Sequence, residues 1–227
     1  LTDKDYNDSG MSDLLSTEQS SYEINIKTFN RLQHTITGWP GGKPEADDTN
    51  RPERADPARK RVIIFSPHPD DDVISMGGTF DRLVTQGHEV HIAYQTSGNI
   101  PVADHEAIKA AEVAQSMERS DIFAQVVQDI ESKTEGDFDS ALVRRLKGHI
   151  RRAESIGATR YLGIPDGQVH FLDLPFYETG TIKKKPLGNE DIEIMNQLIE
   201  DIKPHQIYAA GDLADPHGTH RVCLEAL

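Results

Sequence analysis

The sequence predicts an α/β fold in which a mostly parallel sheet carries helices on both faces. Short apolar runs typical of buried parallel strands, such as Val62–Phe65, alternate with longer segments whose apolar residues recur at helical spacing. A chain of 227 residues is also long enough for one sizeable domain. Because strands joined through helices need crossover connections, they should run parallel, as in a Rossmann-like, doubly wound domain.

The expected elements follow one another from residue 61 onward. A strand over 62–65 leads through a polar loop into a helix whose apolar pattern extends from Val73 to Val84. In chain order, the remaining expected elements are a strand over 90–94, helices over 104–130 and 138–156, a strand over 160–162, a helix over 192–202 and a strand over 206–209.

Residues 1–60 are expected to lie outside this domain, which we place at 61–227. The first 20 residues are polar, one amphipathic helix is predicted over 22–36, and the stretch up to Lys60 has the composition of a linker. A last helix should begin near Thr219, only a few residues before the chain ends. We therefore expect a piece of a longer protein, joined to another domain before residue 61 and truncated at its C-terminus.

Composition narrows the classes of partner. A formal net charge of −14 argues against nucleic acid, because phosphate binding needs a basic face. No apolar run approaches the roughly 20 residues that span a bilayer. The first residues show no basic region followed by an apolar core, so secretion is not expected. The single cysteine, Cys223, excludes an internal disulfide framework and fits the cytoplasm. A small molecule is the expected partner.

Ligands of open α/β sheets bind beyond the carboxyl ends of the strands, so the segments that follow the expected strands are the ones to inspect. Histidine and aspartate gather in the first and last of them. The four segments are Ser66–Asp72, Thr96–Asn99, Gly163–Gly167 and Gly211–His220.

The carboxylates of Asp70, Asp71 and Asp72 stand beside His68 and repel one another unless a cation neutralises them. Zn²⁺ suits mixed imidazole and carboxylate ligands, and catalytic sites hold it with three protein ligands. His217 and His220 can supply the third ligand and a further imidazole. Each segment alone is also explained as a helix cap or a solvated turn, but their coincidence at one sheet edge favours a metal site. Spacing alone leaves the role of each aspartate open.

These segments resemble the PIG-L/LmbE family of zinc-dependent N-acetylglucosaminyl deacetylases. The similarity lies in Pro67–Asp72, followed by Gly77-Gly78, in Leu162–Gly167 and in Asp215–His220. The resemblance implies that His68, Asp71 and His220 ligate the metal, that Asp70 is the general base and that His217 stabilises the oxyanion.

The first and last motifs depart from the family pattern without losing an implied ligand. Pro67 and Asp72 stand where the family usually has alanine and glutamate. Gly218-Thr219 separates the two histidines where Pro-Asp is common. These changes bear on the choice of substrate more than on activity.

Three further features are weaker candidates for substrate binding. Asn99 could hydrogen-bond a sugar hydroxyl, and Asp166 could contact a ligand, although both fit ordinary turns. The run Lys183–Lys185 could contact a phosphate, although such runs usually form solvated loops.

The segment His34–Gly42 is similar to the junction in fusion proteins where a glucosamine-6-phosphate deaminase-like domain precedes a PIG-L/LmbE domain. This resemblance implies an attached deaminase-like domain and N-acetylglucosamine, or its 6-phosphate, as substrate. The alternative is a non-catalytic metal-binding module that docks or regulates such a domain. A magnesium-dependent phosphate enzyme is disfavoured by the two histidines, because Mg²⁺ prefers oxygen ligands.

Overall fold

The computed structural model describes residue 23 and residues 59–227, except for 120, 180–182, 212–213 and 215. The chain divides into two compact units, Leu1–Arg59 and Lys60–Leu227, and the described fold is that of the second. The helix expected over 22–36 and nearly all of the linker lie outside the described residues.

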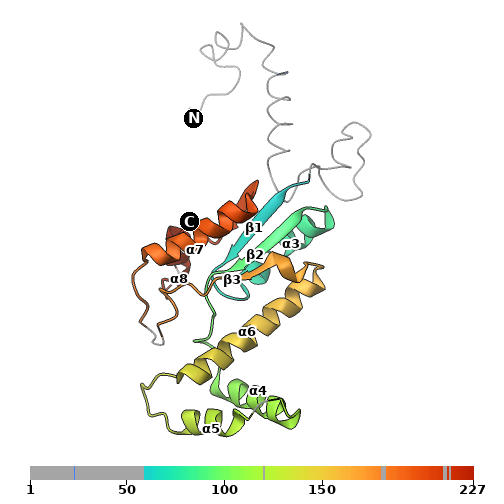
Figure 1. Cartoon of the computed structure of the whole chain (residues 1–227). Helices are drawn as coiled ribbons and strands as arrows, with labels where there is room; N and C mark the ends of the chain where they lie inside the picture. Colours follow the sequence, from blue (N-terminus) through green and yellow to red (C-terminus); the bar gives the residue numbers. More distant parts are fainter. Residues whose placement is uncertain (1–22, 24–58, 120, 180–182, 212–213, 215) are drawn as a thin grey trace. The chain divides into compact units, whose positions relative to one another are not determined.

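Four parallel strands form the described sheet, in the order β3-β2-β1-β4, with β1 and β2 inside (Figure 1). This is the order of the first four strands of a doubly wound sheet. The parallel α/β prediction is therefore confirmed. The strands are β1 (Arg61–Ser66), β2 (Glu89–Tyr94), β3 (Val169–Phe171) and β4 (Gln206–Ala209).

Helices connect the strands and follow the last one. Among the described residues, no helix is both long enough and apolar enough to cross a membrane. In chain order the helices are α3 (Asp71–Thr85), α4 (Asp104–Ser116), α5 (Phe123–Glu131), α6 (Ala141–Tyr161), the short 3₁₀ helix η2 (Asp166–Gln168), α7 (Asn189–Ile202) and α8 (Thr219–Glu225).

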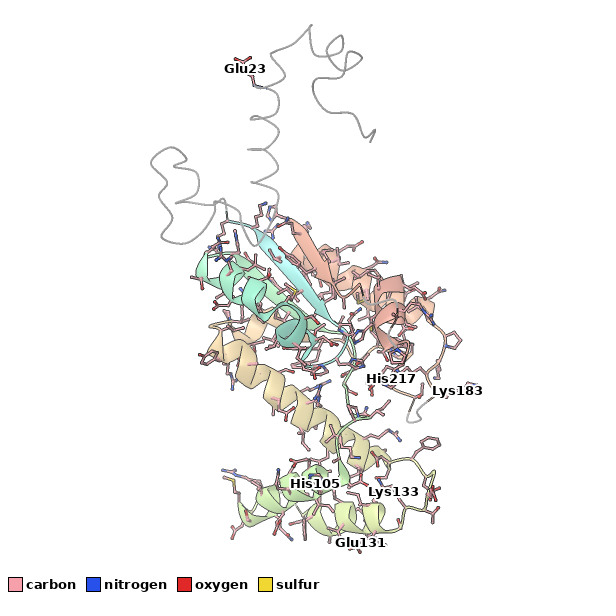
Figure 2. All side chains as sticks on the ribbon, turned by 180° about the vertical axis from the view of Figure 1, so that it is seen from behind. Glu23, His105, Glu131, Lys133, Lys183 and His217 are labelled. Carbon is pink, nitrogen blue, oxygen red and sulfur yellow. The ribbon has the colours of Figure 1, made fainter. Side chains whose placement is uncertain are left out.

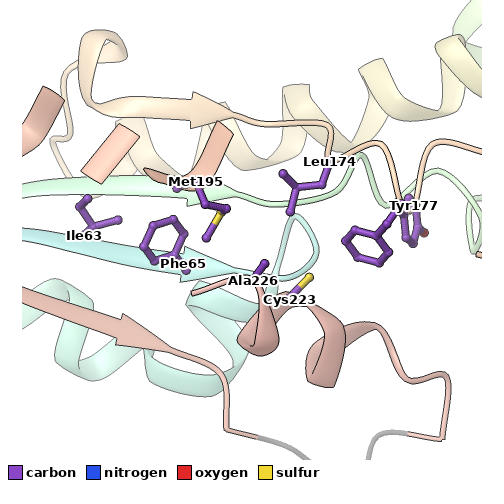
Figure 3. Close-up of a cluster of buried hydrophobic side chains, with 9 residues drawn as sticks. Ile63, Phe65, Leu174, Tyr177, Met195, Cys223 and Ala226 are labelled. Carbon is purple, nitrogen blue, oxygen red and sulfur yellow. The ribbon is translucent and has the colours of Figure 1, made fainter. Parts of the chain in front are cut away.

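Each face of the sheet is covered by its own hydrophobic cluster, because alternate residues of a strand point to opposite faces. Ile63 and Phe65 pack with Met195 of α7 and Cys223 of α8 (Figure 3). Val62 and Ile64, on the other face, pack with Phe80 and Leu83 of α3. Helices on both faces are thus confirmed.

A third cluster joins α4, α5 and the first half of α6, beyond the carboxyl end of β2 (Figure 1). Ala111, Val126 and Val143 form its buried centre. Lys147 of α6 is only 4% exposed and lies 2.7 Å from the carboxylates of both Asp104 and Asp139. Because a buried ammonium group needs such compensation, this ion-pair network holds α6 against α4.

The strand expected over 160–162 is wrong. Arg160 and Tyr161 end α6, which begins after the Ser140 cap; Leu162 caps the helix, and Gly163 then adopts a φ of 81°. The third strand is β3, whose three residues are too few to show an alternating pattern. As a consequence, the loop 163–167 precedes β3 and lies at the amino edge of the sheet.

The single helix expected over 104–130 is also wrong. Met117 caps α4, Glu118 has a φ of 54°, and the chain re-enters a helix only at Phe123. An α-helix cannot continue through a left-handed residue. The break lets α5 fold back against α4 and supply Val126 to the shared cluster.

Replacing Phe80 by alanine should lower the free energy of unfolding by about 3–5 kcal/mol, because Phe80 is 0% exposed between α3 and the sheet. Tyr161→Ala is the matched control, since that ring is 91% exposed and its loss should change stability by about 0.5 kcal/mol or less. Urea unfolding measures both, and equal losses would contradict the assigned core.

Candidate metal centre

Three side chains from two distant segments meet beyond the carboxyl end of β1. Oδ2 of Asp71 lies 3.2 Å from Nδ1 of His68 and 3.2 Å from Nε2 of His220. The two imidazole nitrogens lie 3.3 Å from each other. The three atoms therefore form a nearly equilateral triangle, and among the described residues this is the group suited to hold a metal ion.

The size of this triangle fits a zinc site. Zinc bonds to imidazole nitrogen and carboxylate oxygen are about 2.0–2.2 Å long, so two ligand atoms of a tetrahedral site stand roughly 3.3 Å apart. The measured edges of 3.2, 3.2 and 3.3 Å match that spacing. Three protein ligands leave the fourth tetrahedral position for water or substrate.

A buried hydrogen-bond network shapes the loop between β1 and α3. Oγ of Ser66 lies 2.5 Å from the carbonyl oxygen of His68 and accepts from the backbone N–H of Asp72 at 3.0 Å. The Asp72 carboxylate accepts from the Tyr94 hydroxyl at 2.9 Å. These bonds tie the end of β1 to the first turn of α3, so that His68 and Asp71 face each other.

The neighbouring aspartates Asp71 and Asp72 differ in pKa. Burial works to raise the pKa of Asp71, but hydrogen bonds from His68 and the charge of His220 outweigh it, and the pKa lies below its usual value. Burial raises the pKa of Asp72 above its usual value despite the hydrogen bond from Tyr94. Of these two carboxylates, Asp71 is therefore the one that ionises more readily and is the better ligand for a cation.

Asp70 lies at the N-terminal cap of α3 and points to a different partner. Its Oδ2 lies 2.9 Å from a guanidinium nitrogen of Arg151 on α6, and its side chain is 40% exposed. The ion pair fixes one carboxylate oxygen, and among the described residues no hydrogen bond engages the other. The geometry leaves Asp70 outside the ligand triangle but beside it.

His220 lies in the first turn of α8, and Lys184 holds the loop before that helix through hydrogen bonds. Lys184 donates to Oγ1 of Thr219 and, at 3.3 Å, to the carbonyl oxygen of His217. Its ammonium group also lies 5.2 Å from the centre of the Tyr177 ring, which makes a T-shaped contact with the ring of His68. Lys184 thus links the loop before α8 to Tyr177, which in turn contacts His68.

His217 lies just before α8 and is exposed. Figure 2 shows it on the same side of the domain as Lys183, the neighbour of the anchoring Lys184. The structure does not place it in the ligand triangle with His220, so its expected contact with the oxyanion remains a prediction.

Asn99 is buried in the loop that follows β2. Its amide donates to Oγ of Ser97 at 2.6 Å and to Glu178 at 3.4 Å. Glu178 also accepts from the backbone N–H of Ser97 at 3.1 Å. Asn99 therefore shapes the wall of the site, and its contact with a substrate remains a prediction.

Asp166 is not brought to the site. It begins η2, before β3, and its carboxylate pairs with Arg160 at 2.7 Å on an exposed surface. Because the metal cluster lies at the carboxyl ends of the strands, Asp166 stands at the opposite edge of the sheet. The wrong strand assignment at 160–162 was the source of its expected role.

Sequence reasoning missed Arg151, Tyr177 and Glu178, which surround the predicted residues. Arg151 belonged to a recognised helix, and the density of arginine in that helix was the signal that could have singled it out. Lys184 was noticed only as a member of a basic run. Tyr177 and Glu178 carry no spacing pattern that sets them apart.

Fold and site together define an α/β domain that carries a His/Asp/His cluster suited to hold a metal ion at the carboxyl edge of its sheet. The family model described as GlcNAc-PI de-N-acetylase matches residues 63–227, and the chain therefore belongs to the PIG-L family.

Two similar proteins add detail. A glucosamine-6-phosphate deaminase-like protein of Bacteroides thetaiotaomicron is 56% identical over 237 residues, and the match covers this whole chain but 36% of that protein. A solved structure of N,N'-diacetylchitobiose deacetylase from Pyrococcus horikoshii, in complex with its inhibitor MPG, is similar with a TM-score of 0.50. It is 18% identical, with 92% of this chain and 57% of that chain covered. The structural similarity supports the shared fold.

Replacing Gly98 by alanine should disturb the loop that carries His68. Gly98 has a φ of 61°, and a Cβ atom there would lie 2.6 Å from Cδ of Pro69, next to His68. Gly87→Ala is the control, because Gly87 has a φ of 78° but meets no atom within 4 Å. Both variants bear the left-handed strain of roughly 1–2 kcal/mol, and Gly98→Ala should lose about 1–3 kcal/mol more through overpacking.

Chemical unfolding of the Gly98 and Gly87 variants measures this difference. Equal stability losses would show that the loop after β2 does not support the His68 loop.

Proposed function

We propose that this domain is a zinc-dependent hydrolase that removes the N-acetyl group of an amino sugar. The observation that carries the proposal is the triangle formed by His68, Asp71 and His220, with edges of 3.2–3.3 Å. Membership of the PIG-L family supports hydrolytic N-deacetylation as the reaction.

The donor set favours zinc over magnesium. Two imidazole nitrogens and one carboxylate oxygen match Zn²⁺, whereas Mg²⁺ prefers six oxygen ligands. When bound, the ion would polarise the acyl oxygen and lower the pKa of a bound water. His68, Asp71 and His220 would hold it.

Asp70 is the proposed general base. Its carboxylate takes a proton from the attacking water while the water oxygen bonds to the acyl carbon, and it then returns that proton to the departing nitrogen as the C–N bond breaks. The products are acetate and the free amine. Arg151 holds Asp70 in place through the 2.9 Å ion pair, which orients the carboxylate beside the ligand triangle.

His217 is proposed to stabilise the negative charge that develops on the acyl oxygen. The anchoring of its backbone carbonyl by Lys184 restricts the loop that carries it. A placed cationic or hydrogen-bonding group of this kind commonly contributes about 3 kcal/mol to the transition state.

N-Acetylglucosamine or its 6-phosphate is the proposed substrate. The family model is described by an N-acetylglucosamine-type substrate, and the 56% identical relative has a deaminase-like name. Because this chain spans 36% of that relative, a covalently attached deaminase-like domain is part of the proposal. Deacetylation of the 6-phosphate would supply glucosamine 6-phosphate to such a domain. We further propose a cytoplasmic location, which suits a sugar phosphate.

The purified protein should bind about one zinc ion per chain, and removal by a chelator should abolish acetate release until zinc is returned. His68→Ala should lose most of the bound zinc, because one corner of the triangle disappears. His105→Ala is the matched control, since its side chain is 77% exposed on α4. Metal analysis after dialysis decides, and unchanged zinc content in His68→Ala would refute the ligand assignment.

Asp70→Asn should keep its zinc but lower turnover by roughly 10²–10⁴, the usual contribution of a placed general base. His217→Ala should also keep zinc and lose turnover. Acetate release from N-acetylglucosamine and its 6-phosphate, with metal content measured in parallel, checks both. Loss of zinc in either variant would show that the residue is a metal ligand and that the assigned roles are wrong. A zinc-loaded wild type without activity on any N-acetylated amino sugar would favour the non-catalytic module.

A further inference from the structure

A second feature of the carboxyl edge is a pocket of about 470 Å³ between the loop after β2 and α6. Ser97 and Asn99 line one wall, and Arg144, Arg145 and His149 line the other. Pockets of this volume accommodate small-molecule ligands. The concentration of basic side chains is unusual for a chain with a formal net charge of −14.

The pocket lies next to the candidate metal centre. Gly98, between two lining residues, is packed so closely on the His68 loop that an added Cβ would lie 2.6 Å from Cδ of Pro69. On the other wall, a Cβ on Gly148 would lie 3.5 Å from Cβ of Ser97, so α6 rests directly on this loop. Arg151, which pairs with Asp70, lies on the same helix.

The carboxylates in the pocket wall are engaged by groups other than Arg144 and Arg145. Asp173 pairs with Arg152, and Glu178 accepts hydrogen bonds from the backbone of Ser97 and the amide of Asn99. Neither carboxylate forms an ion pair with Arg144 or Arg145 within the described part of the chain. With three arginines against two carboxylates, the pocket lining keeps a net positive charge.

The arrangement of the basic groups suits an anion with several oxygens. Arg145 and His149 stand one helical turn apart and share a face of α6. One guanidinium nitrogen of Arg144 donates a hydrogen bond to the carbonyl oxygen of Asp139 at 2.9 Å. Guanidinium groups bind phosphate through forked, charge-assisted hydrogen bonds. Because Lys147 is locked between Asp104 and Asp139, this part of α6 is held in position.

The basic residues of the pocket and Arg151, the partner of Asp70, lie along the same helix. Arg151 lies six positions after Arg145, which corresponds to a rise of about 9 Å along the helix axis at 1.5 Å per residue. A hexosamine with its acetamido group near Asp70 would reach the arginines with a substituent on the far side of the ring. The run Lys183–Lys185 is not among the described residues that line this pocket.

We propose that Arg144, Arg145 and His149 form an anion subsite that binds the phosphate group of a phosphorylated N-acetyl amino sugar. The inference rests on the proposed deacetylase function and names the group that selects the substrate. It replaces Lys183–Lys185 by the arginine cluster of α6 as the phosphate contact.

The test compares kcat/KM for acetate release from N-acetylglucosamine and from its 6-phosphate, in the zinc-loaded chain. The double variant Arg144→Gln/Arg145→Gln should lower kcat/KM for the phosphorylated sugar by roughly 10²-fold, because two hydrogen bonds to a charged group are lost. Its kcat/KM for the unphosphorylated sugar should stay within about twofold. Arg119→Gln/Arg160→Gln is the matched control, since it removes the same charge from exposed positions and should change neither value.

Equal kcat/KM for the two sugars in the wild type, or equal losses in the double variant, would overturn the subsite. If neither sugar releases acetate, the proposed function fails, and calorimetric binding of glucosamine 6-phosphate decides the subsite separately. Weaker binding to the double variant than to the control would support it, and equal binding would overturn it. Circular dichroism checks the fold of each variant, and Arg145→Gln alone, at an exposed position, serves if the double variant does not fold.

Discussion

Three consecutive carboxylates at the start of α3 cannot share one environment, because like charges at this spacing repel one another. In the structure each carboxylate has different partners. Asp70 pairs with Arg151, Asp71 lies between two imidazoles, and Asp72 is buried under the hydroxyls of Tyr94 and Ser66. The buried member fixes the loop, the middle member faces the histidines, and the first member stays at the surface of the site. Divided in this way, one short sequence provides a structural anchor, a candidate metal ligand and a candidate base.

Helix α6 is the second constraint on the site. Its first half is fixed by the Lys147 ion pairs, and its second half packs beside β3 (Figure 1). Between these contacts it presents Arg151 to Asp70 and an arginine-rich wall to the loop after β2. The same rigid helix therefore orients the proposed base and the proposed anion subsite, which would set the distance between the reacting amide and the phosphate.

The sequence was informative where the signal was local. The apolar runs that became β1, β2 and β4 were long enough to identify. The motifs after β1 and at the start of α8 placed His68, Asp71 and His220 at one edge. Failures arose where tertiary packing decided: β3 is too short to show a period, and Glu118 interrupts a continuous helical pattern. Arg151, Tyr177 and Lys184 come from segments remote in sequence, so only the fold could show that they converge on the site.

The central claim is that His68, Asp71 and His220 are arranged in advance as three corners of a tetrahedral zinc site. Anomalous X-ray diffraction at the zinc edge, from crystals grown with zinc, tests it most directly. The account predicts one strong peak at about 2.0–2.2 Å from Nδ1 of His68, Oδ2 of Asp71 and Nε2 of His220. A zinc ion held instead by Asp70 or His217, or bound elsewhere while the triangle stays without metal, would contradict it.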